Sequence, residues 1–242
     1  MSVQLFSAPE EFYTEHIKKC EESFKKLFPF FEYTILRIFN LKESDKEKAR
    51  HYLNKMIIFH DLGKLTKKWQ ENINKNWKPA HAPIGASLLF KILENSLEEF
   101  EDLKNAIIFA VTIHHTDRGL LGDNIERPDV RAILEGVIKK DETIDWDEKH
   151  KDLSKDFFPQ EAENLNIYDL NQMARNLRIW AKGCSLLEQH KRRLQVCFIH
   201  HILKLCDIYA ALGRKKFEEE KESYFGGKLM IEEIRKYVES KI

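Results

Sequence analysis

A histidine and an aspartate stand side by side in the segment Phe59-His60-Asp61-Leu62-Gly63-Lys64. A neutral imidazole and a carboxylate are both good ligands for a divalent cation. A carboxylate has two oxygens, so Asp61 can bridge two cations about 3.5–4 Å apart, the spacing used in phosphodiester hydrolysis. Adjacent helical residues point about 100° apart, so His60 and Asp61 reach one site only near a helix end. Gly63, just beyond them, is a typical helix stop and predicts that end.

Other positions carry residue types that suit metal ligation. His114 and His115 follow an apolar run that we expect to be buried, and such a pair is costly unless it finds a partner. A metal is one such partner. His81 precedes a proline that can start a helix. Asp207 lies in an apolar stretch where an acid needs a partner, either a metal or a buried salt bridge. His16 lies on the first expected helix.

The candidate ligands occur in a fixed order along the chain: His16, His60-Asp61, His81, His114-His115, Asp207. This order resembles the HD superfamily of metal-dependent phosphohydrolases, and most of all the stand-alone HD nuclease of type I CRISPR interference. The resemblance covers about residues 5–212. It also includes the opening Leu5-Phe6-Ser7-Ala8-Pro9, the continuation of the His-Asp motif through Lys64, Thr66 and Trp69-Gln70, and the small residues Gly85-Ala86 after His81.

The resemblance implies an all-α, HD-superfamily helical domain around a two-metal site. One metal site would be formed by His16, His60, Asp61 and Asp207. The second would be formed by Asp61, His81, His114 and His115. In the family a metal-activated water attacks a phosphodiester of single-stranded DNA, and some members also cut RNA. Lys64 would lie near the scissile phosphate, so Asp61 and Lys64 are the candidate catalytic residues.

The same resemblance implies cofactors and partners. Two divalent cations are expected, and ligation rich in histidine favours Mn²⁺, Ni²⁺, Co²⁺ or Fe²⁺, with Mg²⁺ less natural for imidazole. The expected partners are single-stranded nucleic acid, a separate CRISPR helicase subunit and an RNA-guided surveillance complex. The sequence has no GxxxxGK[ST] phosphate loop, so any unwinding must come from another chain.

Two alternatives share the metal site. The chain could be an HD-superfamily nucleotide phosphohydrolase acting on a mononucleotide or cyclic dinucleotide, although the cyclic-dinucleotide branch carries a Gly-Tyr-Pro signature that this sequence lacks. It could also be a non-catalytic subunit that keeps its metal for stability. The ligand set argues against that second alternative, because structural sites usually close on one cation with four ligands.

A candidate nucleic-acid contact lies further along the chain. Arg175, Arg178 and Lys182 are spaced so that three cations share one helix face. Trp180 and Trp69 could stack unpaired bases, as proteins that bind single strands require. The alternative interpretation is a solvated helix face and ordinary core aromatics.

Helices are expected to position all of these residues. Apolar residues recur at helical spacing over 10–28, 43–59, 83–97 and 103–115, and over a long tract, 171–212, with a break near Gly183. The stretch 31–39 is ambiguous, and no strands are predicted. The acidic stretch 141–163 indicates a solvated insertion or long connection. We expect one domain over 1–242, with a core of about 5–212 and a charged C-terminal tail carrying one more helix at 229–238.

Composition sets further limits. Lys+Arg and Asp+Glu both number 40, which excludes a uniformly basic protein that binds nucleic acid by bulk charge. Only 9 Gly and 6 Pro disfavour a turn-rich all-β fold. No apolar run reaches the roughly 18 residues of a membrane span, and no export signal is visible, so we expect a cytoplasmic chain. The four cysteines have no metal-finger spacing and are expected as small apolar residues: Cys20, Cys184, Cys197, Cys206.

Overall fold

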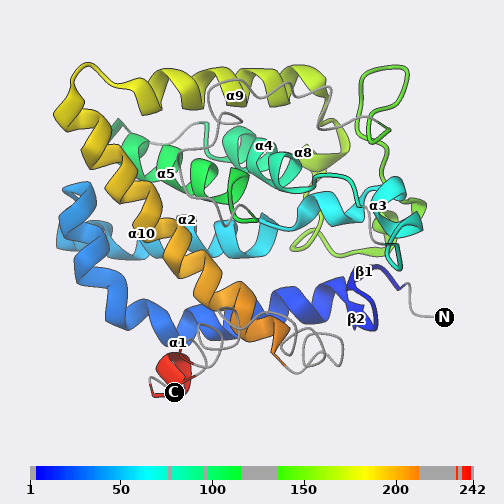
Figure 1. The fold of residues 1–242 in the computed structure, drawn as a ribbon, viewed down its shortest axis with the longest axis horizontal. Helices are drawn as coiled ribbons and strands as arrows, with labels where there is room; N and C mark the ends of the chain where they lie inside the picture. The colour runs from blue at the N-terminus through cyan, green and yellow to red at the C-terminus, as the bar shows by residue number, and fades with distance from the viewer. Residues whose placement is uncertain are drawn as a thin grey trace.

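The computed structural model describes residues 4–75, 78–94, 98–115, 136–212, 233 and 236–240. Helices make up most of this part of the chain and pack into a layered bundle (Figure 1). The predicted all-α fold class is therefore confirmed. The tail predicted beyond residue 212 lies mostly outside the described residues, although Val238 within it is buried.

The longest helix, α1 (Tyr13–Phe39), carries the first candidate ligand. Its buried stripe runs through Ile17, Phe24 and Leu27, at the three- to four-residue spacing of a helix face. The stretch 31–39, ambiguous in sequence, continues this helix because Phe31, Ile35 and Phe39 extend the same buried stripe. The helix ends at Asn40, whose φ of 53° is the left-handed conformation common at such ends.

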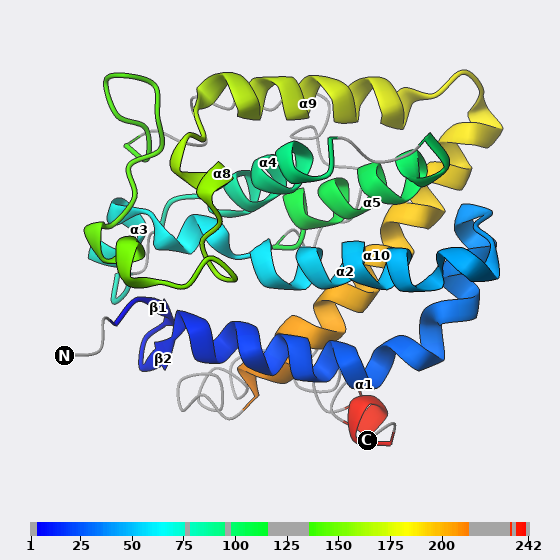
Figure 2. The ribbon, with the colours of Figure 1, turned by 180° about the vertical axis from the view of Figure 1, so that it is seen from behind.

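Helix α2 and three short helical segments connect α1 to the central helices. After η1 (Glu43–Asp45), α2 (Lys46–Phe59) runs antiparallel beside α1 and ends at the His-Asp pair (Figure 2). The chain then turns through η2 (Leu62–Leu65) and α3 (Lys67–Glu71). Gly63 therefore lies in a tight turn rather than at the helix stop itself, and a Cβ there would come within 2.3 Å of the His81 carbonyl oxygen.

The centre of the bundle is formed by α4 (Ala82–Ile92) and, after η3 (Glu98–Phe100), by α5 (Glu101–Thr112). Pro83 lies in the first turn of α4, where its missing N–H costs nothing. Gly85 lets α4 approach the end of α2, since a Cβ there would lie 2.3 Å from the Phe59 carbonyl oxygen. This approach brings the start of α4 close to the His-Asp pair.

Two helices complete the bundle, α9 (Ile167–Lys182) and α10 (Leu186–Ala211). The predicted break near Gly183 is confirmed: Gly183 has a φ of 58°, and Ser185 caps the next helix by accepting a hydrogen bond from Glu188 N–H. In Figures 1 and 2, α9 runs along one edge of the bundle, and α10 runs from the end of α9 across the bundle to α1.

Helix α10 is long and apolar enough for a membrane span by length and composition alone. It packs against α1 and α5, and 50% of its most apolar window is buried inside the bundle. That burial is what a core helix shows, so this observation is weak evidence for a membrane segment.

One sequence expectation is wrong, and a second is only partly right. A short antiparallel hairpin, β1 (Phe6–Ala8) and β2 (Glu11–Phe12), precedes α1 where no strand was predicted, because a pairing this short leaves no alternation to detect. The stretch 141–163 is not simply solvated. It is a long connection that includes η5 (Glu148–Asp152) and α8 (Gln160–Glu163), and it buries Ile144, Trp146 and Phe158 while acids such as Asp141 and Glu142 stay exposed.

Candidate metal centre

The first ligand cluster joins three helices around buried side chains. His16 comes from α1, His60 follows the last residue of α2, and Asp207 lies in the last turns of α10. His16 Nε2 lies 3.2 Å from Asp207 Oδ1, and His60 Nε2 lies 3.9 Å from the same oxygen. Cys20, one turn after His16, belongs to this cluster: one ligand atom from each of the four residues lies within 4.8 Å of all the others.

The second cluster lies where α4 begins and α5 ends. His81 immediately precedes α4, whereas His114 and His115 follow α5. The Nε2 atoms of His81 and His115 are 2.6 Å apart. One ligand atom each from Asp61, His81, His114 and His115 lies within 4.8 Å of the others.

The two oxygens of Asp61 face different clusters. Oδ2 lies 3.4 Å from His16 Nε2 and 3.4 Å from His60 Nε2. Oδ1 lies 3.1 Å from His81 Nε2 and 3.4 Å from His114 Nε2. Asp61 is fully buried between these groups. The structure therefore brings all seven predicted ligands together, in the two groups that the sequence resemblance implied.

Three of the histidine rings have an oxygen next to Nδ1, the ring nitrogen that faces away from the ligand clusters. His60 Nδ1 donates to the Ile57 carbonyl oxygen at 2.8 Å, and His114 Nδ1 donates to the Val111 carbonyl oxygen at 2.6 Å. His16 Nδ1 lies 3.3 Å from Glu11 Oε2. A carbonyl oxygen can only accept, so Nδ1 of His60 and His114 must carry the proton. Their Nε2 lone pairs then point into the clusters, as in metal-ligating histidines.

These donors fit divalent cations. Bond lengths of about 2.0–2.2 Å to nitrogen and oxygen give ligand–ligand distances of about 3.3–3.6 Å in a tetrahedral site. The separations of Asp61 and Asp207 from the neighbouring imidazoles in both clusters, 3.1–3.4 Å at their shortest, fall close to this range. In addition, the buried His60 Nε2 has no hydrogen-bond partner within the described part of the chain. A cation would satisfy it.

Both carboxylates are held ionised. Burial would raise the pKa of Asp61, but the charge of Lys64 holds that pKa well below its usual range. Burial likewise opposes ionisation of Asp207, yet its contacts with His16 and His60 hold its pKa well below the usual value. Each side chain therefore offers a negatively charged oxygen at neutral pH.

Two imidazoles of the second cluster, His81 and His114, are held neutral. Burial, together with the nearby imidazole of His115, lowers the pKa of His114 to about 3. The same two causes lower the pKa of His81 well below its ordinary value. Because a metal binds the neutral form of imidazole, these two rings need lose no proton to act as ligands at neutral pH.

A largely apolar cavity of about 630 Å³ adjoins the second cluster. His81 and His115 line one part of it, and Trp69 and Leu177 contribute apolar surface. The cationic side chains along it are Lys64, Lys78 and Arg178. Lys64 Nζ also donates to Asp61 Oδ2 at 2.6 Å, so this lysine touches both the metal ligands and the cavity.

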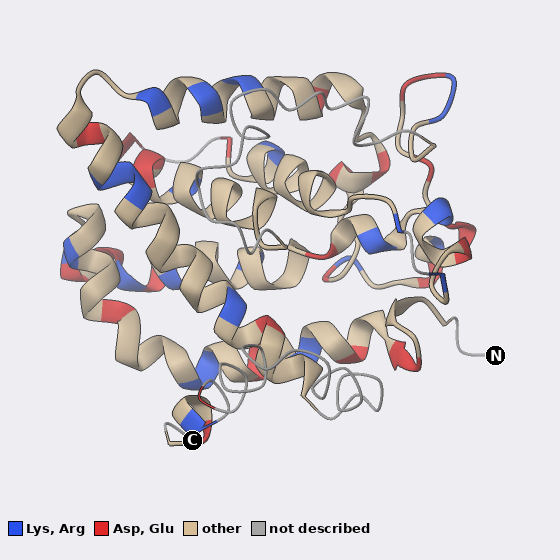
Figure 3. Cartoon of the chain, viewed as in Figure 1, with Lys and Arg blue, Asp and Glu red and all other residues tan. Residues whose placement is uncertain are grey.

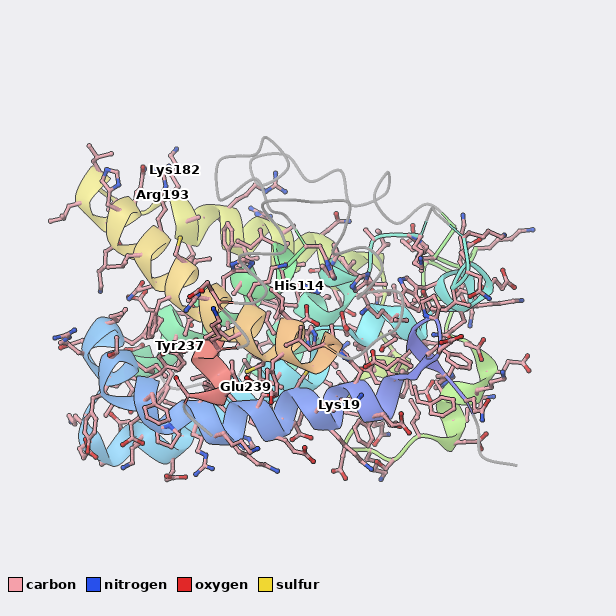
Figure 4. The ribbon with its side chains drawn as sticks, turned by 60° about the horizontal axis from the view of Figure 1, so that its bottom comes forward. Lys19, His114, Lys182, Arg193, Tyr237 and Glu239 are labelled. Carbon is pink, nitrogen blue, oxygen red and sulfur yellow. The ribbon has the colours of Figure 1, made fainter. Side chains whose placement is uncertain are left out.

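Only part of the predicted basic helix face lies at the cavity. Arg175, Arg178 and Lys182 are all exposed on α9, but among them only Arg178 lines the cavity. Lys182 lies near Arg193 at the end of the bundle where α9 meets α10, well apart from His114 (Figure 4). In the view of Figure 3, basic residues follow one another along α9, whereas basic and acidic residues are interspersed over the other described elements.

Trp180 and Trp69, which were expected to stack on unpaired bases, are both buried. Trp180 is 8% exposed, its indole N–H donates to Asp102 Oδ1 at 3.0 Å, and the Arg192 guanidinium covers its ring. This residue is a core aromatic, the alternative interpretation of the sequence. Trp69 is 2% exposed and contributes to the cavity wall, with Lys64 Nζ 5.6 Å from its ring centre.

Sequence reasoning missed two residues that contact His16, one of them outside the first cluster and one within it. Glu11, which contacts His16, gave no signal because its strand is only two residues long. Cys20 was interpreted as an apolar core residue, yet its Sγ lies 3.6 Å from His16 Nε2. The four-residue spacing of His16 and Cys20, which places both on one helix face, was the available signal.

Comparison with known proteins agrees with this geometry, although no protein-family model matches the chain. The sequence is 27% identical over 195 residues to a protein of Methanocaldococcus jannaschii named as the CRISPR-associated nuclease/helicase Cas3. That match covers 72% of this chain but only 26% of the relative, so the chain spans about a quarter of that protein's length.

A second relative matches over most of its length. The CRISPR-associated endonuclease Cas3-HD of Thermoproteus tenax is 23% identical over 223 residues, which cover 84% of this chain and 85% of that protein. Among solved structures, the CRISPR-associated Cas3 HD domain protein of M. jannaschii matches 84% of this chain and 100% of its own, with a TM-score of 0.63 and 18% identity. The chain thus has the fold of the Cas3 HD domain, and the predicted resemblance to the CRISPR-associated HD nucleases is confirmed.

Proposed function

We propose that this protein is a metal-dependent phosphodiesterase that cuts single-stranded DNA in CRISPR interference, with single-stranded RNA as the alternative substrate. The observation that carries the proposal is the position of Asp61, whose two oxygens face two separate clusters of histidines. The names of the two relatives, both CRISPR-associated nucleases, support it.

Two divalent cations, from the group Mg²⁺, Mn²⁺, Ni²⁺, Co²⁺ and Fe²⁺, would supply Lewis-acid activation of water and charge neutralisation at the phosphate. The residues of the chain would hold and orient them. His16, His60 and Asp207 would serve the first position, and His81, His114 and His115 would serve the second. Asp61 would serve both, since its Oδ2 faces the first cluster and its Oδ1 faces the second.

Lys64 has a separate role at the substrate. Its ammonium group lies against Asp61 and lines the cavity, so a phosphate drawn to the ligand clusters would come within reach of it. A buried cation there is suited to stabilise negative charge that develops on phosphate oxygens. The apolar cavity wall offers a place for an unstacked base, and Lys78 and Arg178 offer charges for flanking phosphates.

The single strand would be delivered by other proteins. We propose that a separate CRISPR helicase opens DNA selected by an RNA-guided surveillance complex, in the cytoplasm, and that this chain cuts the strand released.

One observation favours a second candidate, a nucleotide phosphohydrolase. The cavity of about 630 Å³ has the size of a typical small-molecule site and would accommodate a mononucleotide. This candidate has the same metal ligands and differs only in its substrate.

The discriminating experiment offers the purified chain, with added Mn²⁺, circular single-stranded DNA and a panel of deoxynucleoside triphosphates. We expect cutting of the circle, which only an endonuclease can open, and a loss of at least about 100-fold in Asp61→Asn, because both cation positions lose the shared carboxylate. Asp152→Asn, at an exposed carboxylate, is the control. Hydrolysis of the triphosphates alone would establish the second candidate, and equal cutting by wild type and Asp61→Asn would refute both.

A further inference from the structure

We propose that Cys20 Sγ is a ligand of the cation in the first cluster, which makes that position selective for metals that accept a thiolate, such as Zn²⁺ and Co²⁺, over Mg²⁺. The proposal rests on the proposed function only in that a cation occupies this cluster. It gives the two metal positions different chemistry, since the second cluster, Asp61 with His81, His114 and His115, offers only nitrogen and oxygen.

The geometry of α1 supports this assignment. His16 and Cys20 are four residues apart, so their side chains lie one above the other on one helix face. Cys20 Sγ lies 3.6 Å from His16 Nε2. In a tetrahedral site with metal–sulfur and metal–nitrogen bonds of about 2.3 and 2.0–2.1 Å, two such ligand atoms are about 3.5 Å apart. The observed distance is that of two ligands sharing one metal.

The other candidate ligand atoms of the first cluster lie close to the sulfur. Single atoms of His16, Cys20, His60 and Asp207 lie within 4.8 Å of one another. Together with Asp61 Oδ2, which lies 3.4 Å from both imidazole nitrogens, they give a set of two nitrogens, two oxygens and one sulfur. His16, Cys20 and His60 are each 0% exposed. An independent observation points to a ligand here: within the described chain, the buried Nε2 of His60 has no hydrogen-bond partner.

The alternative for Cys20 is a weak hydrogen bond from its S–H group to His16, with no metal contact. The two alternatives differ in proton balance. When the thiol binds a divalent cation, the S–H bond breaks, the proton passes to solvent, and the sulfur lone pair forms the bond to the metal. No electron is transferred, so neither an oxidant nor a reductant is needed.

The selectivity follows from the softness of the ligand. A thiolate suits Zn²⁺ and other borderline cations, whereas Mg²⁺ prefers oxygen ligands and keeps several waters. Removing the sulfur should therefore weaken Zn²⁺ and Co²⁺ binding by about 10-fold or more and leave Mg²⁺ binding nearly unchanged.

The test uses the full chain loaded with Co²⁺ or Zn²⁺. With Co²⁺ we expect a sulfur-to-cobalt charge-transfer band in the near ultraviolet, absent in Cys20→Ala and retained in Cys206→Ala, the matched control at the other buried cysteine. X-ray absorption of the Zn²⁺-loaded wild type should show one sulfur at about 2.3 Å, a measurement that needs no variant to fold.

The outcomes separate the two proposals. Co²⁺ or Zn²⁺ that binds without a sulfur neighbour overturns the role of Cys20 and leaves the metal-dependent function intact. A charge-transfer band that persists in Cys20→Ala also overturns it, because another cysteine must then supply the sulfur. If calorimetry detects no cation at all in the wild type, the proposed function fails together with this inference.

Discussion

The carboxylate of Glu11 lies behind the His16 ring: Glu11 Oε2 is 3.3 Å from His16 Nδ1, while Nε2 of the same ring faces Asp207 and Asp61. Ser7 Oγ donates to the same Glu11 oxygen at 2.7 Å. Glu11 thus orients the ring from outside the ligand set and raises its basicity, as carboxylates behind metal-bound histidines do.

Replacing Glu11 should therefore weaken metal binding without removing a ligand. In Glu11→Ala we expect the Kd for Mn²⁺ to rise by about 10–100-fold, with partial recovery in Glu11→Gln, which keeps an acceptor for the ring N–H. Isothermal titration calorimetry measures both values. Glu15→Ala, at an exposed glutamate in the first turn of α1, is the control, and an equal Kd for Glu11→Ala and this control would contradict the positioning role.

Gly85 sets the distance between α4 and the His-Asp pair. A Cβ at this position would lie 2.3 Å from the Phe59 carbonyl oxygen and 2.8 Å from that of His60, and both neighbours are backbone atoms. We expect Gly85→Ala to lower the free energy of unfolding by about 1–3 kcal/mol and to weaken Mn²⁺ binding, because the helices must separate.

The matched control for Gly85 lies on the same helix. Ser87 is buried, and its hydroxyl has no hydrogen-bond partner in the described ranges, so Ser87→Ala should change the free energy of unfolding by less than about 1 kcal/mol. Urea unfolding followed by circular dichroism compares the two. Wild-type stability and metal affinity in Gly85→Ala would show that the close approach is unimportant.

Asp102 joins α5 to the two last helices. Its oxygens accept hydrogen bonds from Trp180 Nε1 at 3.0 Å, Lys191 Nζ at 3.2 Å and Gln195 Nε2 at 3.3 Å. Burial opposes ionisation, but these donors lower the pKa of Asp102 below its ordinary value. The ionised Asp102 therefore stabilises the fold at pH values above about 3.9, the pKa of an aspartate in the unfolded chain. This stability is lost as the pH falls through the lower pKa that Asp102 has in the folded protein.

We expect Asp102→Asn to lower the free energy of unfolding by about 1–2 kcal/mol at pH 7. The difference from wild type should shrink as the pH falls from about 5 towards 3, because the wild type loses the contribution that the variant lacks. Urea unfolding over this pH range measures the difference, with Asp152→Asn as the exposed control. A difference that stays constant with pH would contradict the role of the ionised carboxylate.

Arg178 is the residue of the basic helix face that lines the cavity. In Arg178→Ala we expect the KM for single-stranded DNA to rise about 5–10-fold, with little change in kcat. The slope of log binding affinity against log salt concentration should become shallower by about one, because one phosphate contact is lost. Arg37→Ala, at an exposed arginine on α1, is the control.

The same experiment tests how much of the basic face of α9 contacts the nucleic acid. If Arg175 and Lys182 also contact the strand, as their spacing predicts, their alanine variants will raise KM as well. An effect confined to Arg178 would limit the contact to the cavity, and no effect at any of the three would remove α9 from the nucleic-acid interface.

The sequence by itself determined which side chains can act as ligands. Imidazoles and carboxylates at otherwise apolar positions indicate a metal whatever the fold around them, and their order carried the resemblance. It also determined most helices, because the spacing of apolar residues along α9 and α10, and the glycine between them, are local properties.

Only the tertiary structure decided which of these groups meet. His16 and Asp207 lie near opposite ends of the chain, and their contact depends on how α10 crosses α1, which no local pattern encodes. The same is true of Trp180, buried against Asp102, and of Cys20, whose thiol joins a cluster rather than the core alone. A sequence pattern specifies which face of a helix is apolar, whereas the neighbour that covers that face is set by the packing of the whole chain.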